Sequence, residues 1–358
     1  MPDSPFLSPS LKTRTKQRYR FAAAILLLAG VTGWHAGSRA SATRVPPNAR
    51  AAITSGLLWL SHQQRANGSF PCPQINDRPA VTSLAIMAFL ARGYTPAHGP
   101  YHQVMIRAIN WVISQQRPDG YIAPPGGTMY DHGISTVMLA EVYGMVNHAQ
   151  RQRVGKALSR AVALILAAQK RTTGVYAGGW RYQPWDTTAD VSCTGWQLMA
   201  LRGAADSGAA IPKQAIADGI QFLIRDACPN GGFSYQPGGP PGRARTGTGI
   251  VAMELLGQRN SPQAIAGGDY LMVHPLQKGQ QFYFYAVYYC SQAANQLGGK
   301  YWRQIYPRIR DQVIQLQTGN GCWLSQDGIE QQGGKVLATS MAVLALCVPF
   351  HYLPLYQR

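Results

Sequence analysis

Two short stretches of the 358-residue chain carry the side chains best suited to chemistry. Asp190 and Cys193 stand at the start of a long apolar stretch, and Asp131-His132 stand at the start of a similar stretch upstream. A buried carboxylate can act as a general acid because burial raises its pKa. Asp, Cys and His are also the residue types that hold zinc. We therefore consider Asp190 and Asp131 as candidate acids, with their use as helix N-caps as the structural alternative.

The elements that must position these residues form a repeat of about 40 to 60 residues. Each unit has an amphipathic helix, a Gly-aromatic turn, and a second, more apolar helix that a glycine closes. The first helices with their turns are predicted in 51–70, 105–122, 157–180, 215–233 and 306–323. The second helices are predicted in 82–93, 134–144, 193–203, 247–257, 282–298 and 339–348.

The fifth unit departs from this pattern. Residues 261–280 keep some helical spacing but lack the Gly-aromatic turn, and six aromatic rings gather between Phe282 and Tyr289 in the helix that follows. An open stack of helix pairs would need polar capping units at its ends, yet the last helix, 339–348, is as apolar as the middle ones. We therefore expect an all-α, closed α/α toroid of six helical hairpins, with the second helices as the inner ring.

The turns resemble a motif of a known superfamily. Gln64 to Phe70 and Gln317 to Trp323 resemble the Q-x3-G-x-W motif of squalene-hopene and oxidosqualene cyclases, and Gln116 to Ile122 follows the same frame with Ile in the aromatic place. With six hairpins, the body of the chain resembles the α/α-toroid superfamily of terpenoid cyclases and protein prenyltransferase β-subunits. We expect the Gln to bond to a neighbouring helix, the Gly to permit a tight turn, and the aromatic ring to wedge between outer helices.

The resemblance also implies where a site would lie. Cyclases of this kind keep a D-x-D-D-T motif at the start of one inner helix, and Asp190 to Thr194 aligns with it. The first Asp and the Thr match, but the middle Asp, which donates the proton in that family, is Ser192, and the last is Cys193. Prenyltransferases resemble this chain in placing Asp, Cys and His at inner-helix starts, where they bind zinc. That resemblance makes Asp190, Cys193 and His132 an alternative zinc set; otherwise we expect no metal and no cofactor.

Further residues are candidates for contact with a substrate. Trp196, Tyr130 and Tyr283 are expected to line an apolar pocket, in which aromatic rings can stabilise cations, together with His132, Cys193 and Glu254. Glu254 and Glu141 lie in apolar helices, where a carboxylate must face a cavity or pair with a cation such as Arg202, Arg243 or Arg245.

Composition and the leader indicate the setting. Hydrophobic residues make up 46% and charged residues 13% of the chain, which is ample for a packed core. The net charge of +18 is compatible with an anionic membrane surface. Outside residues 1–42 the sequence has no cluster of Lys and Arg with interleaved aromatics, so nucleic-acid binding is not expected. Residues 1–42 contain a basic region, the apolar run 21–34 and the small residues Ala40-Ser41-Ala42, which together predict a signal peptide or signal anchor.

The body, residues 43–358, is then expected to be one extracytoplasmic toroid domain, either secreted or periplasmic, or anchored by residues 21–34. Its six cysteines permit disulfides in such a compartment, with a bridge among Cys72, Cys228 and Cys322 as the option.

Three functions stay open at this point. The first is an enzyme or enzyme relative that acts on or binds an isoprenoid or other lipid in the barrel. The second is a non-catalytic toroid that binds lipid or protein, because the D-x-D-D motif is broken. The third is a secreted glycan-active α/α barrel in which Asp131 and Asp190 are paired carboxylates.

Overall fold

The computed structural model describes residues 45–73, 77–171, 173–328 and 330–357. The predicted signal or anchor in residues 1–42 lies outside these ranges. Within them the chain contains twelve α-helices and, besides isolated bridges, no β-strand. No helix in the described part of the chain is both long enough and apolar enough to span a membrane.

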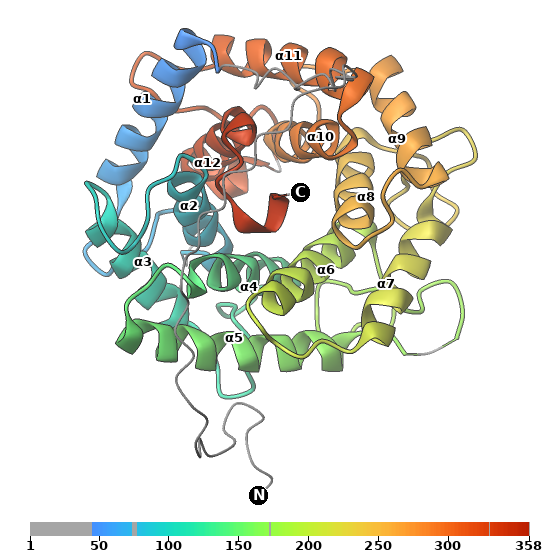
Figure 1. Cartoon of the computed structure of the whole chain (residues 1–358), viewed down its shortest axis with the longest axis horizontal. Coiled ribbons are helices and arrows are strands. Elements are labelled where there is room, and N and C mark those ends of the chain that lie inside the picture. The colour runs from blue at the N-terminus through green and yellow to red at the C-terminus, as the bar shows by residue number, and fades with distance from the viewer. Residues whose placement is uncertain (1–44, 74–76, 172, 329, 358) are drawn as a thin grey trace, which may run out of the picture. The chain divides into compact units, whose positions relative to one another are not determined.

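The helices form two concentric rings (Figure 1). The outer ring consists of α1 (Pro47–Gln63), α3 (His102–Ser114), α5 (His148–Ala168), α7 (Lys213–Asp226), α9 (Pro262–Val273) and α11 (Gly299–Gln315). The inner ring consists of α2 (Pro79–Ala91), α4 (Met129–Tyr143), α6 (Val191–Asp206), α8 (Arg243–Leu255), α10 (Tyr283–Leu297) and α12 (Gly334–Leu346). Neighbouring inner helices pack in chain order, and α12 returns to pack against α2. The predicted all-α toroid of six hairpins is therefore confirmed.

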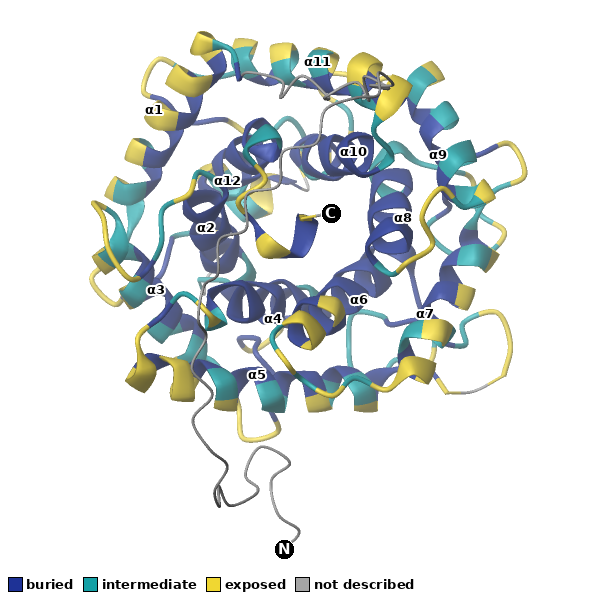
Figure 2. Ribbon diagram, viewed as in Figure 1, coloured by how far each residue is buried: buried dark blue, intermediate teal, exposed yellow. Residues whose placement is uncertain are grey.

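Burial separates the two rings, as their sequences predict. The inner helices are buried over almost their whole length, whereas the outer helices bury one face and expose the other (Figure 2). A helix that is apolar all round is stable only when other elements surround it, and the outer ring supplies that cover.

The glutamine that ends an outer helix ties it to the next outer helix. Gln116 Nε2 donates to the carbonyl of Gly120 in its own turn and, at 2.9 Å, to the carbonyl of Ala157 in α5. The same pair of bonds recurs three times. They run from Gln64 to Gly68 and Val104, from Gln169 to Gly178 and Ala215, and from Gln317 to Gly321 and Ala52. The last set joins α11 to α1 and closes the outer ring.

The glycine of each turn also packs against the next outer helix. Gly120 has φ +93°, and a Cβ placed on it would lie 2.6 Å from the carbonyl oxygen of Arg160. Gly68, Gly178, Gly231 and Gly321 make equivalent approaches to Arg107, Asp218, Ala266 and Ser55. Only glycine fits, because it tolerates positive φ and has no side chain to collide with the carbonyl.

The residue after each glycine turn is held by the inner helix. The backbone N–H of Phe70 donates to the hydroxyl of Thr82, and Trp180, Phe233 and Trp323 donate in the same way to Thr194, Thr246 and Thr339. In the second unit the acceptor is Nδ1 of His132, which takes the N–H of Ile122 at 3.1 Å. The Gly-aromatic turn is therefore pinned to the next outer helix on one side and to its own inner helix on the other.

Two predicted helix boundaries are wrong. The helix expected to end at Gly203 continues to Asp206, and the chain turns at Gly208, which has φ +93°. Gly203 lies inside the helix, where its missing side chain lets Ala140 of α4 approach. The predicted N-cap Asp131 is the third residue of α4, whose N-cap is Thr128.

The chain closes one end of the ring with its own last residues. The 3₁₀ turns η2 (Val348–Phe350) and η3 (Pro354–Tyr356) bring the chain back over the inner ring (Figure 1). The backbone N–H of Leu355 donates to Glu141 Oε1 at 2.9 Å, and Gln296 donates to the carbonyl of Tyr356. Tyr356 is buried and its hydroxyl bonds to that of Tyr288.

Glu141 is thus a buried acid that the C-terminal segment containing η2 and η3 covers. It was expected to face a cavity or to pair with an arginine, and its partner is instead a backbone amide of this segment. Burial raises the pKa of its carboxyl to about 8, against the backbone bond from Leu355, which lowers it.

We predict that Gly120→Ala lowers the free energy of unfolding by about 3 kcal/mol, because it combines backbone strain with a collision against Arg160. Gly99→Ala is the matched control. Gly99 has φ +99° but open space around it, so that variant should lose only about 1 kcal/mol. Urea unfolding measures both, and equal losses would contradict the docking role of the turn.

A second prediction concerns Glu141 and pH. Because its folded-state pKa of about 8 lies above its ordinary value of 4.5, the folded state holds a proton that the unfolded chain releases. Its contribution to stability is therefore present at low pH and lost as pH rises through about 8. Glu141→Gln should be about 4 kcal/mol more stable relative to the native chain at about pH 8.5 than at about pH 4.5. A difference that does not change with pH would contradict the buried-acid assignment.

Candidate functional site

The starts of the inner helices share one rim of the ring. Each inner helix follows an outer one through a hairpin, so all six run in the same direction and their N-termini meet at one end, which we call the N-terminal rim. Asp131 and Asp190 both lie at this rim. Helix N-termini carry partial positive charge, so carboxylates are favourable there even when they have no catalytic role.

Asp131 joins two inner helices. Its carboxylate accepts two bonds from the guanidinium of Arg78, which precedes α2, and its Oδ1 accepts a further bond from the N–H of Ala80. Its Oδ2 accepts the N–H of Thr128 and completes a capping box on α4. Both oxygens are therefore occupied by the chain itself.

Asp190 is the N-cap of α6, as predicted. Its Oδ1 accepts the N–H of Cys193 at 2.9 Å, and its Oδ2 lies 3.2 Å from Nη1 of Arg181. The side chain of Asp190 is fully buried. Asp190 is thus held by a helix terminus and by one cation.

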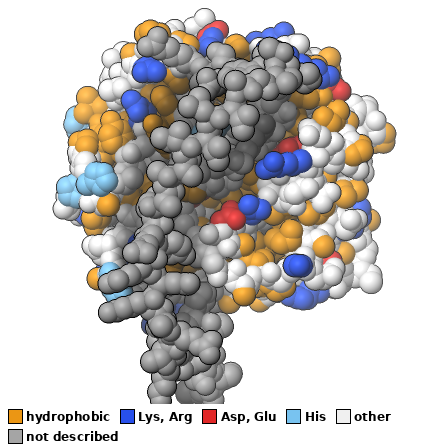
Figure 3. All heavy atoms as spheres, in the orientation of Figure 1, with side chains coloured by type: hydrophobic (Ala, Val, Ile, Leu, Met, Phe, Trp, Pro, Cys, Tyr) orange, Lys and Arg blue, Asp and Glu red, His pale blue; other side chains and the backbone are white. Residues whose placement is uncertain are grey.

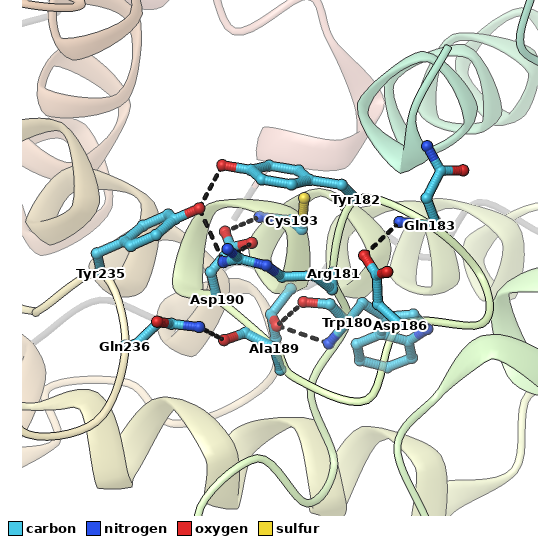
Figure 4. A network of polar contacts seen from close by, with 11 residues as sticks. Trp180, Arg181, Tyr182, Gln183, Asp186, Ala189, Asp190, Cys193, Tyr235 and Gln236 are labelled. Atoms are coloured by element: carbon cyan, nitrogen blue, oxygen red, sulfur yellow. Dashed lines mark hydrogen bonds and ion pairs between the residues drawn. The ribbon is translucent and has the colours of Figure 1, made fainter. Parts of the chain in front are cut away.

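Arg181 connects Asp190 to two tyrosines, and we call Arg181, Tyr182, Asp190 and Tyr235 the rim network (Figure 4). Nη1 of Arg181 donates to the hydroxyl of Tyr235 at 2.8 Å, and the hydroxyls of Tyr182 and Tyr235 bond to each other. The guanidinium also lies over both rings, 4.5 Å from the centre of Tyr182 and 5.1 Å from that of Tyr235. This combination of ion pair, hydrogen bond and stacking is specific to arginine.

Burial raises the pKa of the Asp190 carboxyl to about 6, although the N–H of Cys193 and Arg181 both act to lower it. Burial likewise raises the pKa of Asp131, with Arg78 opposing. A carboxyl that titrates near neutrality suits a general acid. However, the oxygens of both carboxylates accept bonds from the chain itself, and these bonds favour the ionised form.

Below the rim network two tyrosines keep some exposure inside an otherwise buried wall. Tyr130 is half-buried in the first turn of α4, and Tyr285 is half-buried in the first turn of α10, while almost all of their neighbours on the same helices are buried. Tyr130 lies 6.0 Å from Tyr182, ring centre to ring centre. Tyr130 and Tyr285 are therefore the residues in the first turns of these two inner helices that keep partial exposure.

One helical turn deeper, aromatic rings cross the ring interior. Trp196 of α6 stacks on Tyr288 of α10, with centres 6.0 Å apart, and meets Tyr289 edge-on at 5.4 Å. The helix α8 separates α6 from α10 in the ring order, so these contacts span the interior rather than a helix pair. All three rings are fully buried and fill the interior at this level.

The structure does not assemble the alternative zinc set. His132 accepts the N–H of Ile122 at Nδ1 and donates from Nε2 to the carbonyl of Ala161 in α5, so it faces the outer ring. Cys193 is buried beneath Asp190, and burial together with the nearby carboxylate raises the pKa of its thiol well above the ordinary value. Across the described ranges, no three His, Cys, Asp or Glu side chains converge on a point that could hold a metal ion.

Two further candidates lie away from the rim. The hydroxyl of Tyr283 donates to Gln312 of α11, between the rings. Glu254 accepts the N–H of Asn260 in the turn that leaves the far end of α8. The disulfide option is not realised either, because Cys72, Cys228 and Cys322 form no disulfide bond.

Sequence reasoning missed the residues that pair with the aspartates. Tyr182 stands two residues after the turn aromatic Trp180, and Tyr235 stands two residues after Phe233. This recurrence in consecutive repeats was a readable signal for the rim network. Arg78 carried no comparable signal, since its contact with Asp131 depends on how two inner helices pack.

We predict that the Arg181–Asp190 pair is energetically coupled. A double-mutant cycle with Asp190→Asn and Arg181→Gln should give a coupling energy of about 2 kcal/mol, because both groups are withdrawn from water. The exposed pair Arg202–Asp206, at 2.9 Å, is the control and should give less than about 0.5 kcal/mol. Equal coupling in the two cycles would contradict the structural role of the rim network.

Comparisons with known proteins identify the architecture. No family model matches the chain, and no curated protein matches it in sequence. Among solved structures, the GH76A α-1,6-mannanase of Salegentibacter sp. HEL1_6, an inactive variant in complex with α-1,6-mannotriose, superposes with a TM-score of 0.63 at 12% identity, covering 84% of this chain and 99% of that one. The type II terpene cyclase MstE from Scytonema, with its product merosterolic acid A, gives 0.55 at 14% identity, covering 84% and 96%.

Protein geranylgeranyltransferase-I from Candida albicans, complexed with GGPP, gives a TM-score of 0.54 at 10% identity, covering 82% of this chain and 90% of that one. At such low identity these likenesses concern the fold. The chain therefore has the α/α-toroid fold, which it shares with the terpene cyclase, the protein prenyltransferase and the GH76 mannanase named above.

Proposed function

We propose that the N-terminal rim holds a recess beside Tyr130 and Tyr285, that the protein binds an isoprenoid or another polycyclic lipid there, and that it does so without acid-initiated cyclisation. The observation that carries this proposal is the pair of half-buried tyrosines, Tyr130 and Tyr285, on inner helices that are otherwise buried. Ligand sites are concave and mostly apolar, with a few polar groups that fix orientation.

Buried residues lie on the inner side of this inferred recess. Trp196 and Tyr288 stack on each other across the interior, and Leu355 and Tyr356 occupy the opposite end of the inner ring. The indole N–H of Trp196 is buried and has no hydrogen-bond partner among the described residues. Because a buried donor gains from an acceptor, this supports a lipid that carries an oxygen.

The chemistry at the rim supports binding rather than proton transfer to an alkene. Ser192 stands where the cyclase motif has its central aspartate, and a hydroxyl is far too weak an acid for that step. Asp190 is committed to the N-terminus of α6 and to Arg181. The solved neighbours support the ligand class, since one is complexed with the product of a terpene cyclase and another with GGPP.

Glycan binding is the second candidate, and it has its own support. The mannanase gives the higher TM-score, and Trp185, in the loop that leads to α6, is 71% exposed and available to stack on a sugar. Hydrolysis of a glycan has less support than binding. The inactive variant of the mannanase replaces two consecutive aspartates, and this chain has no two consecutive aspartates.

Net charge supports a weak attraction to anionic surfaces. On the face drawn in Figure 3, basic side chains are scattered singly among apolar and uncharged ones, and acidic side chains are few. The chain carries +18 in all. We also propose that residues 1–42 contain an export signal and that the toroid works outside the cytoplasm.

The experiment uses the full chain with squalene, GGPP and α-1,6-mannotriose as probes. Binding is followed by tryptophan fluorescence, and products are sought by mass spectrometry. We expect saturable lipid binding and no cyclic product, and Tyr130→Ala should weaken the lipid affinity about tenfold by removing a wall of the recess. Tyr176→Ala, a half-buried tyrosine in an outer turn, should leave it unchanged.

Two results would overturn the proposal. Binding of mannotriose without binding of either lipid would favour the glycan function. Cyclic products that disappear in Asp190→Asn would show that acid catalysis operates after all.

A further inference from the structure

A cavity lies in the wall of the toroid, apart from the rim. It has a volume of about 320 Å³ and lies between α9, α10 and α11. Its walls are the apolar side chains of Leu271, Leu276, Ile305 and Ile309, all of them buried. Protein interiors rarely contain apolar space of this size between adjacent helices, so its position needs a physical cause.

The cause is the degenerate fifth repeat. The segment that follows α9 lacks both the Gly-aromatic turn and the glutamine that precedes this turn. In the other units this turn fills the space between one outer helix, the next outer helix and the inner helix. Residues of the three corresponding helices, α9, α11 and α10, line the cavity.

The spacing on α11 supports this correspondence. In the intact units, the glutamine and the glycine of the turn contact two backbone carbonyls of the next outer helix, three residues apart. These carbonyls belong to Val104 and Arg107, to Ala157 and Arg160, or to Ala52 and Ser55. On α11 the residues Ile305 and Arg308, also three apart, line the cavity. The next residue on this face is Ala108, Ala161 or Gly56 in those units, whereas α11 has the larger Ile309.

Arginines at this position normally bond to the docked turn. Arg107 donates to Oε1 of Gln64, and Arg160 donates to the carbonyls of Arg117 and Pro118. Arg308 is exposed at the edge of the cavity. It makes no hydrogen bond or ion pair with another residue of the described ranges. Its five N–H donors therefore have no acceptor among the residues that the structure describes.

The remaining edge of the cavity is polar and carries no carboxylate. His274 and Gln312 lie beside Arg308, and Asp and Glu are absent from the lining, all of which falls within the described ranges. An apolar interior with a guanidinium at its mouth complements a molecule that has an apolar body and one anionic oxygen group.

We propose that this cavity, bounded by α9, α10 and α11, is a binding site for a medium-chain fatty acid. The acyl chain enters between Leu271 and Ile309, in the space that a turn aromatic fills elsewhere, and the carboxylate pairs with Arg308. The site lies in the outer wall and is independent of the lipid site proposed at the rim.

The test is calorimetric titration of the full chain with decanoate and with decanol. We expect saturable binding of decanoate, weaker binding of decanol, and an affinity for decanoate at least about tenfold lower in Arg308→Gln. Arg303→Gln, an exposed arginine on the same helix that does not line the cavity, should bind decanoate as the native chain does. Because Arg308 is on the surface, this variant should fold, and its circular dichroism melt checks that.

A filling variant and a rim variant separate the two sites. Leu271→Phe should abolish decanoate binding by occupying the cavity, whereas Tyr130→Ala should leave it unchanged. Absence of saturable decanoate binding to the native chain would overturn the proposal. So would decanoate binding that is lost in Tyr130→Ala and kept in Arg308→Gln.

Discussion

The docking of each Gly-aromatic turn onto the next outer helix is the interaction on which the rest of the structure depends. A turn such as Gln116 to Ile122 touches three elements at once: its own outer helix, the next one, and the inner helix between them. The set that runs from Gln317 to Ala52 uses the same bonds to join the last outer helix to the first. Four of the six joints between outer helices are made by a glutamine with the same pair of bonds.

The regularity of the joints fixes where chemistry can occur. Because all inner helices run in one direction, their N-termini gather at one rim, and a polar site can form there without exposing the apolar walls. In this chain the charged residues at the rim mainly stabilise the fold. Arg78 and Arg181 neutralise Asp131 and Asp190, and the two carboxylates cap helices rather than face the interior. What stays accessible is aromatic, namely Tyr130 and Tyr285, which favours recognition of an apolar molecule over acid catalysis.

The sequence predicts the periodic features well and the contacts between repeats poorly. Helix spacing, turn glycines and the apolar last helix were enough for the closed toroid, and Asp190 was correctly placed as an N-cap. His132 illustrates the limit. Its residue type indicates a ligand, but its position in the repeat is that of Thr82 and Thr194, where a side chain accepts an N–H from the turn. Alignment of repeats at that position would have shown the structural role.

Other residues could not be assigned from sequence at all. The pairing of Glu141 with the backbone of Leu355 joins positions far apart in the chain through the closing segment. Nothing local in either stretch indicates it. The reverse holds for the fifth repeat, where the absence of a turn was visible in the sequence, while the cavity it leaves became apparent only from the packing of α9, α10 and α11.

The most direct test of the central claim, that an apolar lipid binds at the N-terminal rim, is photoaffinity labelling of the full chain with a diazirine-bearing prenyl probe, followed by peptide mapping. The account predicts labels in the first turns of α4, α6 and α10, at Tyr130, Ser192 and Tyr285, and competition by unlabelled GGPP. Labels confined to the outer helices, or a labelling pattern that GGPP does not reduce, would contradict it.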